Sequence, residues 1–437
     1  MNKGYHSIEL IEKKCIGCTS CIKRCPTEAI RVRSGKALIN HERCIDCGMC
    51  IKVCESHAKK AVTDSLAAIK NFKYKVAIPA PTLYGQFDKI FNVNIILTGL
   101  KQLGFDEVFE VSRAADLVTE YTVKLISEGN LKKPVISSAC PAVVKLITIK
   151  YPALIENILP VNAPVEIMAA LAKGYIAKKG INKEDIGVFF ISPCAAKRTQ
   201  CLYPFGLEKS EVDGVISIAD IYIKLRSLIH SLNLKDTEVL AHSTFKGVSW
   251  AVTGGESEGT KLDSIAVDGV ENVMNVLEEL ENGHLEEIEF IEGLACTGGC
   301  VGGPLTVANG FVAKNSLQKL KTFMKRDGAL KTREIELNPQ SVNFEFTKPL
   351  HPQYSLMLDK DMGKALEKLA KIKQLVKELP GIDCGACGSP TCEALAQDIV
   401  NGGSNIEDCV FMLRSKVKDM AQAMVSLASK LPQTIQG

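Results

Sequence analysis

The spacing of the cysteines constrains this chain more than any other feature of its sequence. Sixteen of the 17 cysteines fall into groups spaced like metal ligands, and only Cys201 stands outside them. Two groups lie near the start, one lies near the end, and four cysteines are spread through the middle. In a reducing compartment, thiols at such spacing bind metals or clusters, and disulfides are the weaker alternative. We therefore expect a cytoplasmic metalloprotein.

Composition predicts a folded chain with more than one core. Hydrophobic residues make up 46% of the 437 residues, and the mean hydropathy is +0.08. This length suggests roughly two to four domains. No apolar run reaches about 18 residues, and the first residues lack the order of a signal peptide. We expect neither a membrane span nor export.

Residues 1–70 contain an internal repeat, CIGCTSCIKRC and CIDCGMCIKVC, with the spacing C-x2-C-x2-C-x3-C. In two-cluster ferredoxins each such run holds one [4Fe-4S] cluster with three cysteines and gives its fourth cysteine to the other cluster. We expect an α+β ferredoxin-like domain, with zinc as the alternative. The expected ligand sets are Cys15, Cys18, Cys21 and Cys54 for one cluster, and Cys44, Cys47, Cys50 and Cys25 for the other.

The start of the chain is also basic. Residues 1–75 hold 15 Lys or Arg against 7 Asp or Glu. We interpret this excess as compensation for anionic clusters. A nucleic-acid surface is the alternative, but aromatic residues do not alternate with the basic ones.

Residues 71–345 alternate short apolar runs with longer amphipathic stretches, which predicts an α/β domain with largely parallel sheets. Three of the four central cysteine sites directly follow strand-like runs. Because open α/β sheets bind ligands at the carboxyl edge, these cysteines could converge on one site. A buried apolar role is the alternative for each one. The four are Cys140, Cys194, Cys296 and Cys300.

Three features beside this pattern carry no metal-ligand spacing. The glycine stretch VTGGESEGTK lacks the phosphate-loop pattern and is expected to be a surface loop. Cys201 is expected to be a buried apolar residue, with a substitute proton donor as the alternative. The polar segment 331–353 is expected to be a linker or a wrapping strand.

Residues 346–437 predict a small, mostly helical module with a third [4Fe-4S] cluster. A helix is expected at about 359–379, and a final helix at about 410–430 is expected to cap the module. Glycines at tight turns accompany a C-x2-C-x4-C run and one later cysteine. Zinc is again the alternative. The expected ligands are Cys384, Cys387, Cys392 and Cys409.

The central motifs SSACPAVV (137–144), SPCAAK (192–197) and LACTGGCVGG (294–303) resemble those of [FeFe]-hydrogenases. The resemblance covers residues 1 to about 310. With its altered motifs and C-terminal cluster module, the chain is most similar to the subgroup assigned to hydrogen sensing. The resemblance implies two lobes around an active site and an H-cluster, a [4Fe-4S] cubane joined to a diiron centre. It also implies machinery that matures the diiron centre.

The resemblance assigns roles to residues of this chain. Cys140, Cys194, Cys296 and Cys300 would hold the cubane, and Cys300 would bridge to the diiron centre. That centre would carry CO, cyanide and a dithiolate bridge, and would split H2. Lys197 matches a lysine that hydrogen-bonds one cyanide, with a solvated surface lysine as the alternative. Thr82 matches a position near the other cyanide.

Three departures remove groups that handle protons or surround the cofactor. Ala139 stands where productive relatives have a proton-shuttling cysteine, Ser192 replaces a methionine, and Gln200 replaces a glutamate. An amide does not titrate in the relevant range. The helix expected at about 114–128 has Thr119 and Thr122 where two acids would stand; it offers Glu120 and Glu128 instead.

Loss of positioned acids predicts slow hydrogen turnover, since such groups contribute about 10² to 10⁴ in rate. We therefore expect a hydrogen or redox sensor that passes electrons to a separate redox or signalling protein, with no nucleic-acid or membrane partner. An electron-transfer or iron–sulfur assembly protein with a plain cubane is the alternative. A signalling protein without hydrogen chemistry is a third class.

Overall fold

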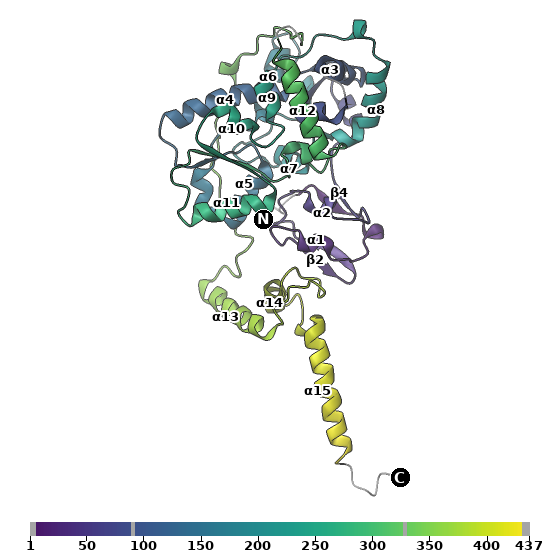
Figure 1. Cartoon of the computed structure of the whole chain (residues 1–437), viewed down its shortest axis with the longest axis vertical. Coiled ribbons are helices and arrows are strands. Elements are labelled where there is room, and N and C mark those ends of the chain that lie inside the picture. Colours follow the sequence, from purple (N-terminus) through teal and green to yellow (C-terminus); the bar gives the residue numbers. More distant parts are fainter. Residues whose placement is uncertain (1–5, 89–91, 327–329, 431–437) are drawn as a thin grey trace. The chain divides into compact units, whose positions relative to one another are not determined.

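The computed structural model describes residues 6–88, 92–326 and 330–430 of the chain (Figure 1). The chain divides into two compact units. The larger unit comprises the described parts of Met1–Glu9, Cys44–Gly48 and Lys60–Gln353, and the smaller unit those of Leu10–Arg43, Met49–Lys59 and Tyr354–Gly437. Within the described residues, no helix is both long and apolar enough to cross a membrane.

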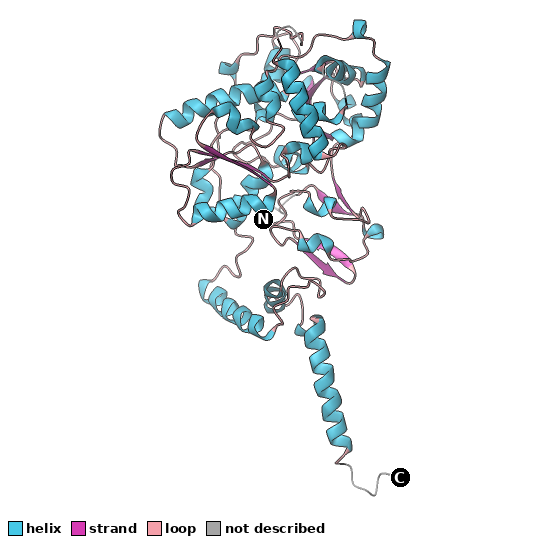
Figure 2. Cartoon of the chain, in the orientation of Figure 1, coloured by secondary structure: helices cyan, strands magenta, loops and turns pink. Residues whose placement is uncertain are grey.

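The larger unit contains two parallel sheets (Figure 2). The four-stranded sheet has the order β6-β5-β8-β9, with bounds Glu107–Val108, Tyr74–Pro79, Ile186–Ser192 and Gly214–Ser217. The three-stranded sheet has the order β10-β11-β7, with bounds Ser264–Asp268, Phe290–Leu294 and Val135–Ile136. The α/β fold with parallel sheets is therefore confirmed.

Burial explains the strand sequences. All seven residues of β8, IGVFFIS, are buried, as expected for a central parallel strand covered on both faces. Successive side chains of a strand point to opposite faces. Accordingly, Phe189 packs into one core cluster, whereas Val188 and Phe190 pack into the other.

Helices supply the rest of both clusters. The first cluster takes side chains from α3, α8 and α12, and the second takes them from α4 and α6. The helices of the larger unit are α3 (Val93–Gln102), α4 (Val111–Ser127), α5 (Pro141–Lys150), α6 (Pro164–Ala177), α7 (Ala195–Leu202), α8 (Ile218–Ser231), α9 (Phe245–Ser249), α10 (Gly255–Thr260), α11 (Val270–Glu281) and α12 (Gly310–Met324).

The amphipathic pattern after YKVAIPAP predicts a helix at about 86–102, but the helix begins later in the structure. The Asn92 side chain accepts a hydrogen bond from the Asn94 amide, so α3 starts at Val93. A 3-10 helix occupies Pro81–Gln86, and residues 89–91 lie outside the described residues.

Residues 331–353 wrap along the larger unit as an extended segment. The Phe344 carbonyl accepts from the Asn162 amide at 2.7 Å, and the Phe346 amide donates to the Pro160 carbonyl at 2.9 Å. The alternative of a wrapping strand was therefore the better expectation.

The smaller unit combines a hairpin and two short helices with three longer helices. Its antiparallel hairpin consists of β2 (Ile30–Arg33) and β3 (Lys36–Ile39), beside the short helices α1 (Ser20–Lys23) and α2 (Met49–Lys52). Helices α13 (Met362–Glu378), α14 (Cys392–Val400) and α15 (Val410–Ala428) follow. Strands β1 (Ile8–Leu10) and β4 (Lys59–Ala61) span the points where the chain passes between units.

The C-terminal module is joined to β2 by backbone and charged contacts. The Val32 amide donates to the Gly388 carbonyl at 2.8 Å. Gly388 has a φ of +81°, and a Cβ there would lie 1.9 Å from the Val32 carbonyl oxygen, so only glycine fits. One Asp398 carboxylate oxygen accepts from Arg31 at 2.6 Å and from Arg33 at 2.7 Å.

The expectation that the last helix caps the module was wrong. No residue of α15 is buried. The module's core closes with Ile372, Leu379 and Leu395, and only Met412 of α15 packs against it. The apolar positions of α15 suggested burial, but α13 and α14 already cover the core.

We predict that Asp398→Asn destabilises the C-terminal module by about 2 kcal/mol, because two partly buried guanidinium groups lose their charged acceptor. The module should lose protease resistance at a lower urea concentration than in the wild type. Glu393→Gln, an exposed change on the same helix, is the control and should have no effect. Equal midpoints for Asp398→Asn and wild type would contradict this account.

Candidate metal centre

One buried pocket in the larger unit gathers the four central cysteines. Its volume is about 110 Å³, and it is lined by Cys140, Cys194, Cys296 and Cys300. The lining segments follow β5, β7, β8 and β11, so both sheets point their carboxyl ends at it. The expected convergence of these four positions is what the structure shows.

Two of the cysteines stand at helix starts. Cys140 is the N-cap of α5, which begins with Pro141, and Cys194 is the N-cap of α7. Helix N-termini carry partial positive charge and unpaired amides, which favour an anionic thiolate. Both helices therefore stabilise negative charge in the pocket.

The thiols also act on one another. Burial, followed by the charge of Cys140, raises the pKa of Cys194 to about 11. Burial, followed by Cys140 and Cys194, raises the pKa of Cys300 to about 12. Several thiolates cannot share so small a pocket without a compensating cation, and a bound metal would supply one. The donor set thus fits an iron–sulfur cluster.

Close backbone packing positions the loop that carries the other two cysteines, Cys296 and Cys300. Gly299 has a φ of +91°, and a Cβ there would lie 2.7 Å from the Thr253 amide nitrogen. A Cβ on Gly303 would lie 2.3 Å from the Pro193 carbonyl oxygen. The glycines of CTGGCVGG are required because the loop lies directly on neighbouring backbone.

Lys197 and Thr82 both line the pocket. The Lys197 ammonium donates to the Gln200 side-chain oxygen at 2.9 Å, and its charge lowers the pKa of Cys194 against the effect of burial. The Thr82 hydroxyl is buried and has no hydrogen-bond partner among the described residues. Buried polar groups are normally paired, so this hydroxyl fits a bound group with acceptor atoms.

Of the substituted positions Ala139, Ser192 and Gln200, only Ala139 lines the pocket. Ala139 presents only a methyl group to the pocket. Ser192 ends β8, and its hydroxyl bonds to the backbone of Cys194, at 3.0 Å to the amide nitrogen and 3.1 Å to the carbonyl oxygen. Ser192 therefore shapes the turn rather than lining the pocket.

Two acids in the pocket were missed. Glu256 and Glu292 both line it. Glu256 lies in VTGGESEGTK, so the surface-loop expectation was wrong: this stretch forms α10, and Glu256 is 3% exposed. One residue could have revealed this pair of acids from the sequence: Glu292, a charged residue in the buried strand FIEGL.

The two carboxyl groups have different partners. Glu292 accepts from the Gly254 amide at 3.0 Å and the Ser257 amide at 2.8 Å, whereas Glu256 accepts from the Ser137 hydroxyl at 2.7 Å. Burial, then the charge of Glu292, raises the pKa of Glu256 to about 8. Glu256 can therefore hold or release a proton near neutral pH.

Helix α4 contributes no acid to the pocket. Glu120 and Glu128 are exposed. Thr119 accepts from the Trp250 indole at 3.1 Å, and the buried Thr122 hydroxyl has no partner among the described residues.

The N-terminal repeat has a matching geometry in its two halves. The Cys25 sulfur accepts from the Ala29 amide and the Cys54 sulfur from the Ala58 amide, both at 3.2 Å. Burial raises the pKa of Cys21, and the charges of Cys18 and Cys15 add to it, which places these three thiols together.

The loop Cys44–Gly48 belongs to the larger unit and packs on the loops around the pocket. A Cβ on Gly48 would lie 2.5 Å from Pro304, a few residues after Cys300. Asp46 accepts from Thr199 of α7 at 2.8 Å. One cluster loop is thus held against the segments that carry the pocket cysteines.

Ligand atoms of His6, Cys44 and Asp46 lie within 4.8 Å of one another, a grouping that sequence reasoning did not identify.

The C-terminal cysteines also converge. Cys387, Cys392 and Cys409 share one core cluster. Burial raises the pKa of Cys387, with added effects from Cys409 and Cys384. By contrast, Cys201 packs partly buried against a core of the larger unit, and burial raises its pKa to about 12.

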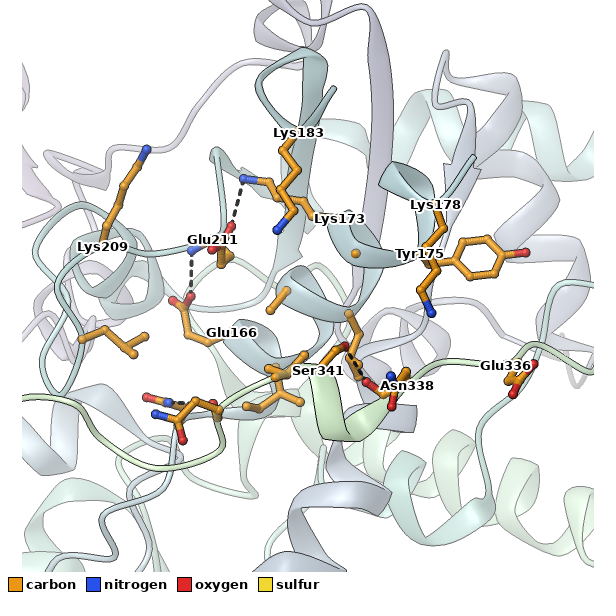
Figure 3. Close-up of a pocket in the computed structure, with 18 residues that line it drawn as sticks. Glu166, Lys173, Tyr175, Lys178, Lys183, Lys209, Glu211, Glu336, Asn338 and Ser341 are labelled. Atoms are coloured by element: carbon orange, nitrogen blue, oxygen red, sulfur yellow. Dashed lines mark hydrogen bonds and ion pairs between the residues drawn. The ribbon is translucent and has the colours of Figure 1, made fainter. Parts of the chain in front are cut away.

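A second hollow of about 410 Å³ lies elsewhere in the larger unit (Figure 3). One ion pair joins two of its charged lining residues, Lys173 and Glu211, at 3.4 Å, and Lys173 also pairs with Asp213 at 3.0 Å. At its base Glu166 accepts from the Ser210 hydroxyl. We assign no chemistry to this hollow.

Known families match all three parts of the chain. The family described as iron only hydrogenase large subunit, C-terminal domain, matches residues 73–261 and 233–304. A 4Fe-4S dicluster domain matches residues 7–55, and an Fe-S cluster family matches residues 379–411.

Individual relatives include hydrogenases and an assembly factor. The chain is 27% identical over 362 residues to the periplasmic [Fe] hydrogenase large subunit of Nitratidesulfovibrio vulgaris, covering 68% of this chain and 86% of the relative. It is 27% identical over 361 residues to the NADP-reducing hydrogenase subunit HndD of Solidesulfovibrio fructosivorans, covering 69% of this chain but only 59% of that relative. It is 24% identical over 259 residues to "Probable cytosolic Fe-S cluster assembly factor oxy-4" of Caenorhabditis elegans, covering 48% of this chain and 56% of the relative.

The hydrogenase match covers more than half of the chain and contains every segment that brings a cysteine to the pocket. The chain belongs to the iron-only hydrogenase large subunit family.

Proposed function

We propose that this protein binds H2 and slowly interconverts it with protons and electrons, as a hydrogen or redox sensor. The observation that carries the proposal is one pocket lined by four cysteines, Lys197 and Thr82. A plain structural cluster needs the thiolates alone. The Lys197 ammonium carries charge, and the Thr82 hydroxyl has no partner among the described residues. Both groups suit a cofactor that has polar ligands of its own.

The four pocket cysteines would hold the cubane of an H-cluster, with Cys300 as the bridge to its diiron part. When bound, the diiron part supplies the position where H2 binds and splits. Lys197 and Thr82 would donate hydrogen bonds to its cyanide ligands and so orient it. The two parallel sheets serve as two lobes around the site.

Proton transfer in this pocket relies on Glu256. Ala139 has no proton to give, and Ser192 bonds to backbone. Glu256 is buried in the pocket wall, and the Ser137 hydroxyl donates to its carboxylate. Glu292, held by two amides, keeps a second carboxyl group beside it. One acid route in place of a full relay fits slow turnover.

Electrons would pass through two N-terminal [4Fe-4S] clusters and one C-terminal cluster to a separate redox or signalling protein. The contacts of Gly48 with Pro304 and of Asp46 with Thr199 support transfer from the N-terminal repeat to the pocket. Maturation machinery would supply the diiron part. We place the protein in the cytoplasm, where thiols stay reduced, with no nucleic-acid or membrane partner.

Slow hydrogen turnover suits a role in sensing. A site that binds H2 but turns over slowly reports hydrogen through its occupancy and redox state. The altered positions Ala139 and Gln200 therefore suit a sensor of the subgroup that the motifs resemble.

An electron-transfer or iron–sulfur assembly protein with a plain cubane is the second candidate. The similarity to the oxy-4 assembly factor favours it. Such a protein would need neither Lys197 nor the buried acids of the pocket.

Hydrogen isotope exchange tests the proposal directly. After maturation with the diiron part, the protein under D2 in H2O should release HD, because splitting the gas at the site exchanges its atoms with solvent protons. A sample of the same protein that carries its cubanes but no diiron part is the matched control, and it should release no HD. Equal HD release from both preparations, or none from the matured one, would reject hydrogen chemistry and favour the second candidate.

Replacing the buried acid should slow proton delivery without removing the cofactor. We predict that Glu256→Gln lowers H2 evolution at least tenfold, since positioned acids contribute about 10² to 10⁴ in rate. The assay is gas evolution with a reduced viologen dye.

Glu120→Gln is the control for this change, because Glu120 is exposed and lies on the helix where sequence reasoning looked for acids. It should leave the rate unchanged. A full rate in Glu256→Gln would show that protons reach the pocket by another path.

A further inference from the structure

Helix α15 presents a stripe of apolar side chains that contact no core. None of its 19 residues is buried, and Figure 1 draws it as one continuous helix. The six large side chains of the stripe are 44–69% exposed: Val410, Leu413, Val417, Met420, Met424 and Leu427.

The stripe follows a strict heptad pattern. Successive members are separated by three, four, three, four and three residues. A helix that covers a globular core has a wider apolar face. Alternating steps of three and four give the narrow seam of a coiled coil, in which Val410, Val417 and Met424 take the a positions and the others the d positions.

We propose that α15 forms an antiparallel two-stranded coiled coil with α15 of a second copy of this chain. In that arrangement Val410 faces Leu427 of the second copy, Leu413 faces Met424, and Val417 faces Met420. All six seam positions then find a partner, and the two-fold arrangement closes on itself.

Charge selects this orientation. The positions beside the seam hold Arg414 and Lys416 in the first half of the helix, and only Ala421, Ala423 and Ala428 in the second half. An antiparallel pair places each basic side chain beside alanines of the other copy. A parallel pair would gather four basic side chains at one end, next to two positive helix termini.

The base of α15 leaves the seam accessible. Met412 packs against the module's core, and Lys416 pairs with Glu407. At about 100° per residue, Met412 lies on a different side of the helix from the seam. The core contact of Met412 therefore lies on another side of the helix, and the six seam side chains stay 44–69% exposed beside the Lys416–Glu407 pair.

The length of the seam sets the expected stability of the dimer. Six seam positions make close to three heptads, near the lower limit for a coiled coil. We expect a dimer that forms and dissociates with protein concentration.

Sedimentation of the full, cluster-loaded chain tests the proposal. The wild type should sediment as a dimer at about 50–100 μM, whereas Met420→Lys with Met424→Lys should sediment as a monomer, because charge at the seam has no partner. Ser415→Lys with Gln422→Lys adds the same charge on the opposite side and should leave the dimer intact. A monomeric wild type, or a dimer that survives the seam change, would overturn the proposal.

Cysteine pairs test the orientation. A mixture of Val417→Cys chains and Met420→Cys chains should form mixed disulfide dimers on mild oxidation, and Val417→Cys chains alone should not. Cross-linking of Val417→Cys chains alone would show a parallel pair and overturn the antiparallel assignment. Co-sedimentation of monomeric chains with anionic vesicles would instead identify a lipid surface as the occupant, and would also overturn the proposal.

Discussion

Burial of several thiols in one small pocket is the constraint on which the larger unit depends. Each sheet ends at this pocket, and two of the surrounding helices begin at a pocket cysteine. Burial and mutual repulsion raise the pKa values of Cys194 and Cys300, so the thiolate forms need positive charge beside them. Bound iron would meet that need, and the segments after the parallel strands hold the four positions around one pocket.

The proposal of slow turnover rests on the same pocket. It keeps the thiols, Lys197 and the Thr82 hydroxyl, which concern binding of the cofactor. At the positions that concern protons it has a methyl group at Ala139 and an amide at Gln200. The buried acids Glu256 and Glu292 approach from α10 and β11 instead, and under the proposed function they would handle protons from another wall of the pocket.

Sequence patterns predicted the parts that depend on local spacing. The cysteine runs, the strand-like segments before Cys140 and Cys194, and the α/β architecture all follow from periodicity and ligand geometry. The acid pair did not, because Glu256 and Glu292 lie 36 positions apart and meet only through the packing of α10 on β11. Glu292 alone gave a signal, as a charge in an apolar strand. Local patterns also could not predict that α15 stays exposed, because this depends on whether α13 and α14 leave any core for it to cover.

Infrared spectroscopy of the matured protein tests the central claim most directly, because CO and cyanide on iron absorb where protein does not. The account predicts sharp bands in the carbonyl and cyanide stretching region for the wild type, and their loss in Cys300→Ser. A spectrum without such bands, from protein whose pocket cubane is fully loaded, would contradict the assignment of a diiron group to this pocket.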